Sequence, residues 1–158
     1  RPVNSFLFYS LYRVDFPSLI NLSIALCFQI FMLTKYSLNL FIIIEFTISI
    51  LLSIYLVFLL NQIVITISFW KEHSNAIMGI PEYLIDFSSR PKSIYPKSIQ
   101  FVLIYIVPIL LSINLPVLIV KGEASALSIL YIFLFDLLGT IFAIFLWKKG
   151  LKKYVSAN

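Results

Sequence analysis

The sequence predicts an all-α integral membrane protein: a bundle of about four transmembrane helices, with a kinked third helix and a cytoplasmic or interfacial amphipathic segment. Of its 158 residues, 61% are hydrophobic and only 12% are charged. Soluble domains average about 45–50% apolar and about 25% charged residues. A domain of this length still exposes roughly a third of its unfolded surface, so its core cannot hide the apolar excess. The chain is therefore expected to fold in a lipid bilayer.

A polar interlude, residues 71–98, divides the apolar sequence into two halves, and each half is long enough to cross a membrane twice. The expected spans lie in a single transmembrane domain, residues 1–158, and cover residues 17–34, 40–69, 99–120 and 124–147. At about 1.5 Å per residue the first span reaches about 27 Å, close to the ~30 Å of a hydrocarbon core. Because the turns after the first and third spans are very short, the spans on either side of them are expected to pack antiparallel.

Two amphipathic stretches lie beside these spans. Residues 1–16 carry aromatic and apolar side chains roughly at helical spacing, which predicts a short interfacial helix. The alternative is that they are the start of the first span. Residues 75–87 predict a second interfacial helix, interrupted by Pro81, with a short span as the alternative. The chain begins at Arg1 without a signal-peptide pattern, so we expect it to be a fragment that lacks earlier spans.

The third span carries Pro108 and Pro116, which are the candidate kink residues. Each proline removes a backbone hydrogen bond, and lipid supplies no substitute partner. The bend is therefore expected to face protein or a water-filled cavity.

The distribution of Lys and Arg predicts the orientation. If residues 71–98 are cytoplasmic, only Lys35 and Lys121 lie on the outer face. Ten basic residues then lie on the cytoplasmic face: Arg1, Arg13, Lys71, Arg90, Lys92, Lys97, Lys148, Lys149, Lys152 and Lys153. This positive-inside bias places both ends of the chain in the cytoplasm. Because the basic residues flank hydrophobic spans, membrane topology explains the net charge of +5, and no nucleic acid partner is expected.

The sequence also excludes several classes of catalyst. It contains no GxxxxGK[ST] phosphate loop, and its four glycines are too scattered to build one. With one histidine and one cysteine it has neither a metal-ligand cluster nor a Cys–His pair. We therefore expect no enzyme activity, no cofactor and no metal in this chain.

Asp136, near the middle of the fourth span, is the most informative polar residue. A carboxylate at the bilayer centre costs at least about 2.5–3.5 kcal/mol, so it is expected to face the bundle interior. The role we expect is structural: a protonated or helix-bonded Asp that joins two spans. Its expected partner is a hydroxyl or amide such as Asn21 or Gln29, a carbonyl that Pro108 or Pro116 frees, or a group on the earlier spans that this chain lacks. The alternative is a polar point on a substrate path or a dimer seam. Glu45 is a second candidate intramembrane polar residue, nearer the outer interface.

Three stretches together resemble one family. Residues 1–8, RPVNSFLF, resemble the "LLRPVNxLF" loop of ABC-2 type transporter permeases. The FSSRP of residues 87–91, the IYP of residues 94–96 and the later Pro108 and Pro116 resemble that family's "FxxYPxxIYP…IIPxxFxxxxPA" signature. Residues 146–157, LWKKGLKKYVSA, resemble its closing "LWRxGLRRYxSAG". Ser89 and Arg90 depart from the usual Arg/Lys-Tyr pair.

The resemblance implies a permease of about six spans, of which this chain holds the last four. It implies an exporter that works as a homo- or heterodimer among membrane lipids, on separate ABC ATPase subunits, in a plasma membrane that we expect to be a bacterial inner membrane. The resemblance also places residues 1–16 in a cytoplasmic coupling loop that contacts the ATPase. The candidate ATPase-coupling residues in this loop are Arg1, Pro2, Asn4 and Arg13. The alternative function is a non-transporting membrane scaffold or sensor, whose basic face recruits a partner or anionic lipid.

Overall fold

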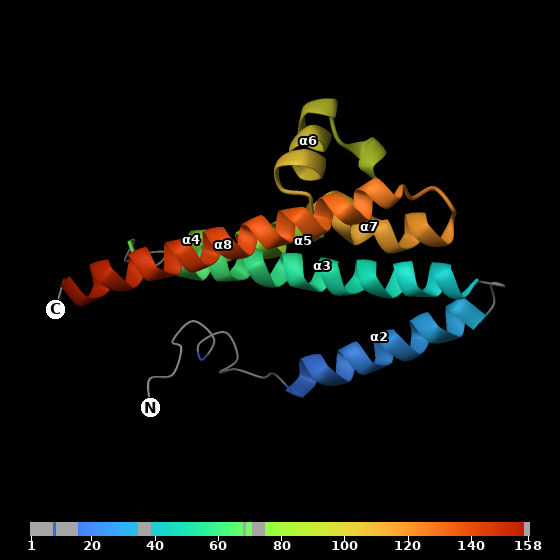
Figure 1. Ribbon diagram of the computed structural model, residues 1–158, viewed down its shortest axis with the longest axis horizontal. Coiled ribbons are helices and arrows are strands. Elements are labelled where there is room, and N and C mark those ends of the chain that lie inside the picture. Colours follow the sequence, from blue (N-terminus) through green and yellow to red (C-terminus); the bar gives the residue numbers. More distant parts are fainter. Residues whose placement is uncertain (1–7, 9–15, 35–38, 68, 71–74, 157–158) are drawn as a thin grey trace. The chain divides into compact units, whose positions relative to one another are not determined.

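The structure, a computed structural model, describes Phe8 and residues 16–34, 39–67, 69–70 and 75–156. Throughout these residues the regular structure is helical and contains no strand (Figure 1). The chain divides into two compact units, Arg1–Ile43 and Ile44–Asn158. The helical content and the long apolar helices confirm the predicted all-α membrane class. The interfacial helix expected in residues 1–16 falls almost entirely outside the described residues.

The described part of the first unit is dominated by α2 (Phe16–Thr34). Pro17 lies in its first turn, where the missing N–H has no intrahelical partner to lose. Ser23 Oγ donates to Leu19 O at 2.8 Å, and Thr34 Oγ1 donates to Phe31 O at 2.7 Å. These hydroxyls are thus satisfied within the helix itself, as an apolar environment requires.

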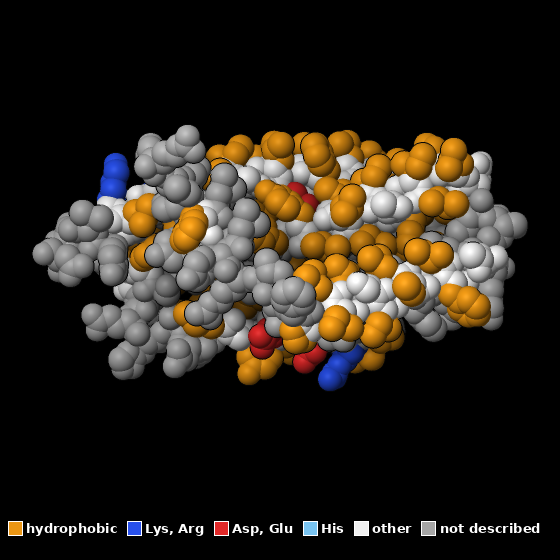
Figure 2. Space-filling model, turned by 90° about the horizontal axis from the view of Figure 1, so that it is seen from below, with side chains coloured by type: hydrophobic (Ala, Val, Ile, Leu, Met, Phe, Trp, Pro, Cys, Tyr) orange, Lys and Arg blue, Asp and Glu red, His pale blue; other side chains and the backbone are white. Residues whose placement is uncertain are grey.

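Two long helices frame the second unit: α3 (Leu40–Ile67), which begins at the boundary between the units, and α8 (Ala126–Ser156). α3 and residues 126–152 of α8 are each long and apolar enough to cross a membrane. At about 1.5 Å per residue α3 is about 42 Å long, which exceeds the ~30 Å hydrocarbon core. The two helices run side by side in Figure 1. Figure 2 shows a face on which hydrophobic side chains greatly outnumber charged ones, as expected of a surface in contact with lipid.

The polar interlude forms α4 (Asn75–Met78), α5 (Ile80–Ser88), the 3₁₀ turn η1 (Lys92–Ile94) and α6 (Lys97–Phe101). The break between the first two helices falls at Gly79, whereas the sequence predicted it at Pro81. Pro81 lies in the first turn of α5, where proline removes no helical hydrogen bond. α5 also packs against α7, with Pro81 and Ser88 buried. The interlude therefore contributes a helix to the bundle.

The stretch expected to be the third span is divided in two. α6 continues into the π-helical turn η2 (Val102–Ile106), and α7 (Ile109–Val120) follows after a bend of 83°. Pro108 has no N–H to donate, Val107 N donates to Val102 O, and Ile109 N donates to Val107 O, so the regular ladder stops here. The sequence predicted a kink, and the structure has a nearly right-angled break.

The number of crossings depends on this break. Among the described residues two helices can span a membrane, or three if the bent pair counts as one span. The sequence predicts four. The first predicted span corresponds to α2, whose apolar stretch Leu22–Phe31 is shorter than a full crossing, and it stays a prediction.

The turn between α7 and α8 requires a glycine. Gly122 has φ 71°, in the left-handed region that only glycine adopts freely. Its N–H donates to Ile119 O at 3.0 Å, and Glu123 N–H donates to Leu118 O at 2.9 Å, which is the Schellman ending of a helix. The chain thus reverses within a few residues, and α8 packs back against α7.

The core of the second unit lies where α3 meets the break. It consists of Leu56, Leu103, Ile109 and Leu110, all buried, with partly buried apolar side chains around them. A Cβ on Gly139 of α8 would lie 3.2 Å from Leu59 Cδ1, so this glycine permits a close approach of α8 to α3.

Candidate functional site

The first polar cluster surrounds Pro116 in α7. Pro116 has no N–H, so the carbonyl oxygen of Ser112, four residues earlier, lacks its helical donor. Ser53 Oγ of α3 lies 2.7 Å from that oxygen and 2.7 Å from Ser49 O of its own helix, so its single hydrogen is shared between the two carbonyls. Ser112 Oγ in turn donates to Ser53 Oγ at 3.0 Å. Because Ser112 is completely buried, these bonds replace water and hold α7 against α3.

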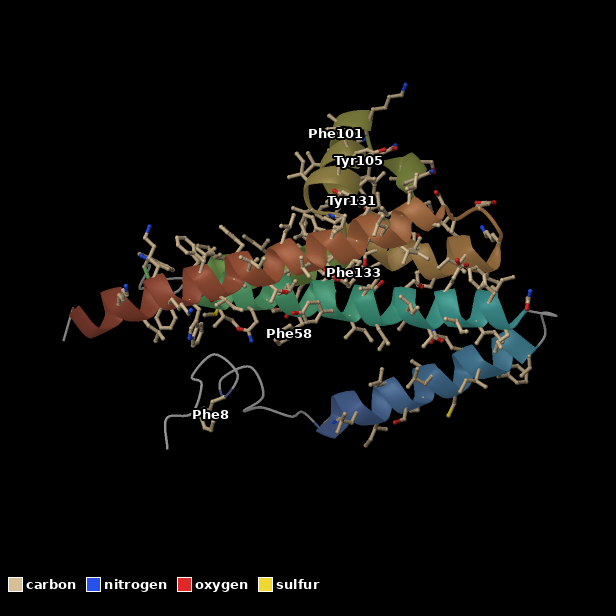
Figure 3. The ribbon with its side chains drawn as sticks, in the orientation of Figure 1. Phe8, Phe58, Phe101, Tyr105, Tyr131 and Phe133 are labelled. Carbon is tan, nitrogen blue, oxygen red and sulfur yellow. The ribbon has the colours of Figure 1, made fainter. Side chains whose placement is uncertain are left out.

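A second cluster compensates for the break at Pro108. In a continuous helix the Tyr105 carbonyl would accept from Ile109 N, but that N–H donates to Val107 O instead. The Tyr131 hydroxyl of α8 donates to Tyr105 O at 2.6 Å. Figure 3 shows Tyr131 on α8 next to the turn that carries Tyr105. The break therefore faces protein, and α8 supplies the donor that the backbone lacks.

A third polar contact joins the interlude to α7. Asn114 Nδ2 donates to Leu110 O of its own helix at 2.7 Å and to Ser88 O of α5 at 3.3 Å. The Ser88 hydroxyl is satisfied by Leu84 O at 2.8 Å. Ser53, Ser88 and Tyr131 were not singled out from the sequence. The carbonyl that Pro116 frees can be counted off the sequence, but the residue that donates to it cannot.

Asp136 occupies the most unusual position in the second unit. Its side chain is only 3% exposed, and neither carboxylate oxygen accepts a hydrogen bond in the part of the chain that the structure describes. It lines a cavity of about 410 Å³ between α3 and α8. The other lining residues are Leu52, Tyr55, Phe133, Leu137, Thr140 and Ile141.

Of the backbone partners expected for Asp136, the Ser112 carbonyl, which Pro116 frees, lies 2.7 Å from Ser53 Oγ. The other is the Ile104 carbonyl, four residues before Pro108, and neither carboxyl oxygen of Asp136 has a hydrogen-bond partner among the described residues. Asn21 and Gln29 belong to α2, in the other unit. Within the described part of the second unit, Asp136 is therefore a buried carboxylate that faces a cavity without a hydrogen-bond donor.

The remaining predicted site residues lie apart from this cavity. Glu45 is partly buried on α3 and does not line it. Pro108 stands at the break and Pro116 is buried inside α7. The candidate coupling residues fall outside the described residues: Arg1, Pro2, Asn4 and Arg13. No group of three or more His, Cys, Asp or Glu side chains that could hold a metal occurs among the residues described.

A second cavity, of about 310 Å³, joins residues that were expected on opposite sides of the membrane. Lys92 and Lys121 both line it, together with Asn114 and Glu123. The cause is the break at Pro108, which turns α6 and η2 by 83° out of the direction of α7. The loop that carries Lys92 therefore lies near the end of α7.

A family model described as an ABC-2 family transporter protein matches residues 1–158. The chain belongs to the ABC-2 transporter family. It is thus a permease component of an ABC transporter, a membrane transport component that is not itself catalytic. ABC-2 membership confirms the resemblance drawn from the sequence motifs, and it implies association with ABC ATPase subunits and with the membrane. Comparisons with curated proteins and with solved structures gave no match.

Proposed function

We propose that this chain is the transmembrane subunit of an ABC exporter, that it forms the translocation path as a homo- or heterodimer, and that separate cytoplasmic subunits hydrolyse the ATP. The observation that carries the proposal is the family match across residues 1–158. The sequence supports this division of labour because the 158 residues contain no phosphate-binding loop.

The proposed orientation places both ends of the chain and residues 71–98 in the cytoplasm of a plasma membrane, which we propose is a bacterial inner membrane. The asymmetry of Lys and Arg supports it. Lys92 lines the same cavity as Lys121. Without Lys92, nine Lys and Arg residues remain on the proposed cytoplasmic side against two on the outer side.

Transport would follow from rigid-body motion of packed helices. Closure of the ATPases pushes on cytoplasmic loops, and a well-packed bundle transmits the push as a rotation of the permease. Two contacts with α8 support its motion together with α3 as one rigid body. Tyr55 hydrogen-bonds Thr140 at 2.8 Å, and the rings of Phe69 and Trp147 meet edge-on with their centroids 5.2 Å apart. The first contact joins α3 to α8, and the second joins the turn after α3 to α8 near its basic end.

Association with an ATPase tests the proposal. The protein is co-expressed with a candidate ABC ATPase subunit from the same organism and purified by a tag on the permease. Arg13→Glu reverses a charge in the proposed coupling loop, so we expect at least a tenfold loss of co-purified ATPase. Lys121→Glu is the matched control, because this exposed residue lies in the turn proposed to be outside. It should leave co-purification unchanged.

Both variants must first be shown to reach the membrane at wild-type levels. Loss of the ATPase from both variants alike, or from neither, would contradict the proposed coupling loop. If the wild-type protein retains no ATPase at all, the exporter proposal fails and the scaffold or sensor function takes its place.

A further inference from the structure

The Asp136 carboxylate lacks a donor although two hydroxyl groups lie nearby. Thr140 Oγ1 donates its hydrogen to the backbone oxygen of Asp136 at 2.7 Å. Tyr55 and Thr140 share a hydrogen bond of 2.8 Å, and since the Thr140 hydrogen is already used, Tyr55 must be its donor. Both hydroxyl hydrogens are therefore engaged, and neither is available to the carboxylate.

A buried carboxyl group in this state is stabilised either by taking up a proton or by a positive partner from outside the described residues. An unpaired charge in a medium of low dielectric constant is strongly destabilised, and a nearby opposite charge is the most effective compensation. No Lys, Arg or His is among the residues that line the cavity. The cavity lining thus includes one acidic side chain and no positive group, and the two carboxylate oxygens lie just beneath its surface.

The walls define the chemistry of the partner. Leu52, Phe133 and Leu137 make them predominantly apolar, and the rings of Tyr55 and Phe133 can also attract a cation through their faces. Figure 3 shows Phe133 on α8, the helix that carries Asp136. A calcium or magnesium ion would require about six oxygen ligands, which this lining does not supply. A volume of about 410 Å³ instead lies within the range of organic-ligand pockets.

We propose that the cavity between α3 and α8 binds a hydrophobic organic cation, whose positive charge pairs with the Asp136 carboxylate while its apolar body fills the space beside Tyr55 and Phe133. The rim supports entry from the bilayer, because Phe133 and Leu137 are about half exposed on the apolar flank of α8. That such a cation is also the transported substrate rests on the proposed exporter function. Binding itself does not.

Equilibrium binding of tetraphenylphosphonium to the full-length protein in lipid nanodiscs tests this assignment. Tetraphenylborate, an anion of nearly the same size and shape, is the matched probe. We expect saturable binding of the cation and none of the anion. Asp136→Asn keeps the shape of the side chain and removes its charge, so it should weaken cation binding at least tenfold. Glu45→Gln makes the same chemical change on α3 outside the cavity and should have no effect.

Leu137→Trp keeps the test decisive if Asp136→Asn fails to fold. Leu137 is 49% exposed, so a larger side chain there is tolerated, but it would occupy the mouth of the cavity and should also weaken cation binding at least tenfold. Unchanged binding in Asp136→Asn or Leu137→Trp, equal binding of the two probes, or no saturable binding to wild type would each overturn the proposal. Because binding is measured without an ATPase, a negative result here leaves the co-purification experiment unaffected.

Discussion

Replacing Ser53 with alanine should weaken the contact of α3 with α7 at the carbonyl that Pro116 deprives of its helical donor. Ser53 Oγ shares its hydrogen between Ser49 O of its own helix and the Ser112 carbonyl that Pro116 leaves without a helical partner, each at 2.7 Å. Ser112 is 0% exposed, so water cannot take over the bond. We therefore expect Ser53→Ala to lower the free energy of unfolding.

The expected loss is about 1.5 kcal/mol. Hydrogen bonds between membrane helices average about 0.6 kcal/mol and reach about 1.7 kcal/mol. A buried carbonyl left without a donor costs about 1–3 kcal/mol. We take a value near the upper end of the range for hydrogen bonds between membrane helices, because the variant loses two such bonds. Ser112 Oγ, which donates to Ser53 Oγ at 3.0 Å, loses its acceptor as well.

A double-mutant cycle with Pro116→Ala isolates the cause. This substitution restores a backbone N–H, which can donate to Ser112 O within α7, so that oxygen no longer depends on Ser53. The cost of Ser53→Ala should then fall to about 0.5 kcal/mol, a coupling of about 1 kcal/mol between the two sites. Pro116→Ala alone also loses packing volume, but this loss is common to both arms of the cycle and cancels.

Unfolding by dodecyl sulfate in mixed micelles, followed by tryptophan fluorescence, provides the measurement. Trp147 is buried, so its emission reports on packing in the second unit. Ser89→Ala is the control, because the exposed Ser89 hydroxyl of the same unit donates to Asp86 O at the end of its own helix. If Ser53→Ala costs the same in the wild-type protein and in the Pro116→Ala variant, the Ser53 hydroxyl does not compensate for the proline and the reasoning is refuted.

Two further predictions concern topology and packing. In a Cys27→Ala background, Ser125→Cys should react with an impermeant maleimide added to intact cells and Ser89→Cys should not; both side chains are exposed, and labelling at Ser89 would reverse the proposed orientation of the interlude. Gly150→Ala should lower the free energy of unfolding by about 1–3 kcal/mol, because its Cβ would lie only 2.6 Å from Phe69 Cδ2. Gly139→Ala should cost less, since its Cβ at 3.2 Å meets only a leucine methyl group, which can shift. Equal losses in the same dodecyl sulfate titration would contradict this packing.

Local patterns in the sequence were enough to predict the structural class of the protein and the positions at which prolines interrupt its helices. Apolar composition and the lengths of the apolar runs indicated an all-α membrane protein. The missing N–H of a proline is a property of the residue itself, so the two interruptions at Pro108 and Pro116 could be identified without coordinates. The same holds for the family, because its motifs are short stretches of sequence that the match to residues 1–158 confirms.

The size of the interruption at Pro108 could not be read from the sequence. A proline inside a helix is compatible with a small kink or with a complete break, and Pro116 and Pro108 have these two different outcomes. At Pro116 the helix continues, and Ser53, 59 residues earlier, lies within hydrogen-bond distance of the Ser112 carbonyl. At Pro108 the chain turns by 83°, and Tyr131, 26 residues later than Tyr105, donates to the Tyr105 carbonyl.

Asp136 shows the same division between local and distant information. The sequence by itself determined that a carboxylate lies deep in an apolar helix and must turn inward, because exposure to lipid costs too much free energy. Only the tertiary structure decided what surrounds it: two hydroxyls engaged with other acceptors, apolar walls and a cavity. The physical reason is that burial cost depends on the residue, whereas hydrogen-bond partners depend on which side chains of other helices the fold brings within about 3 Å.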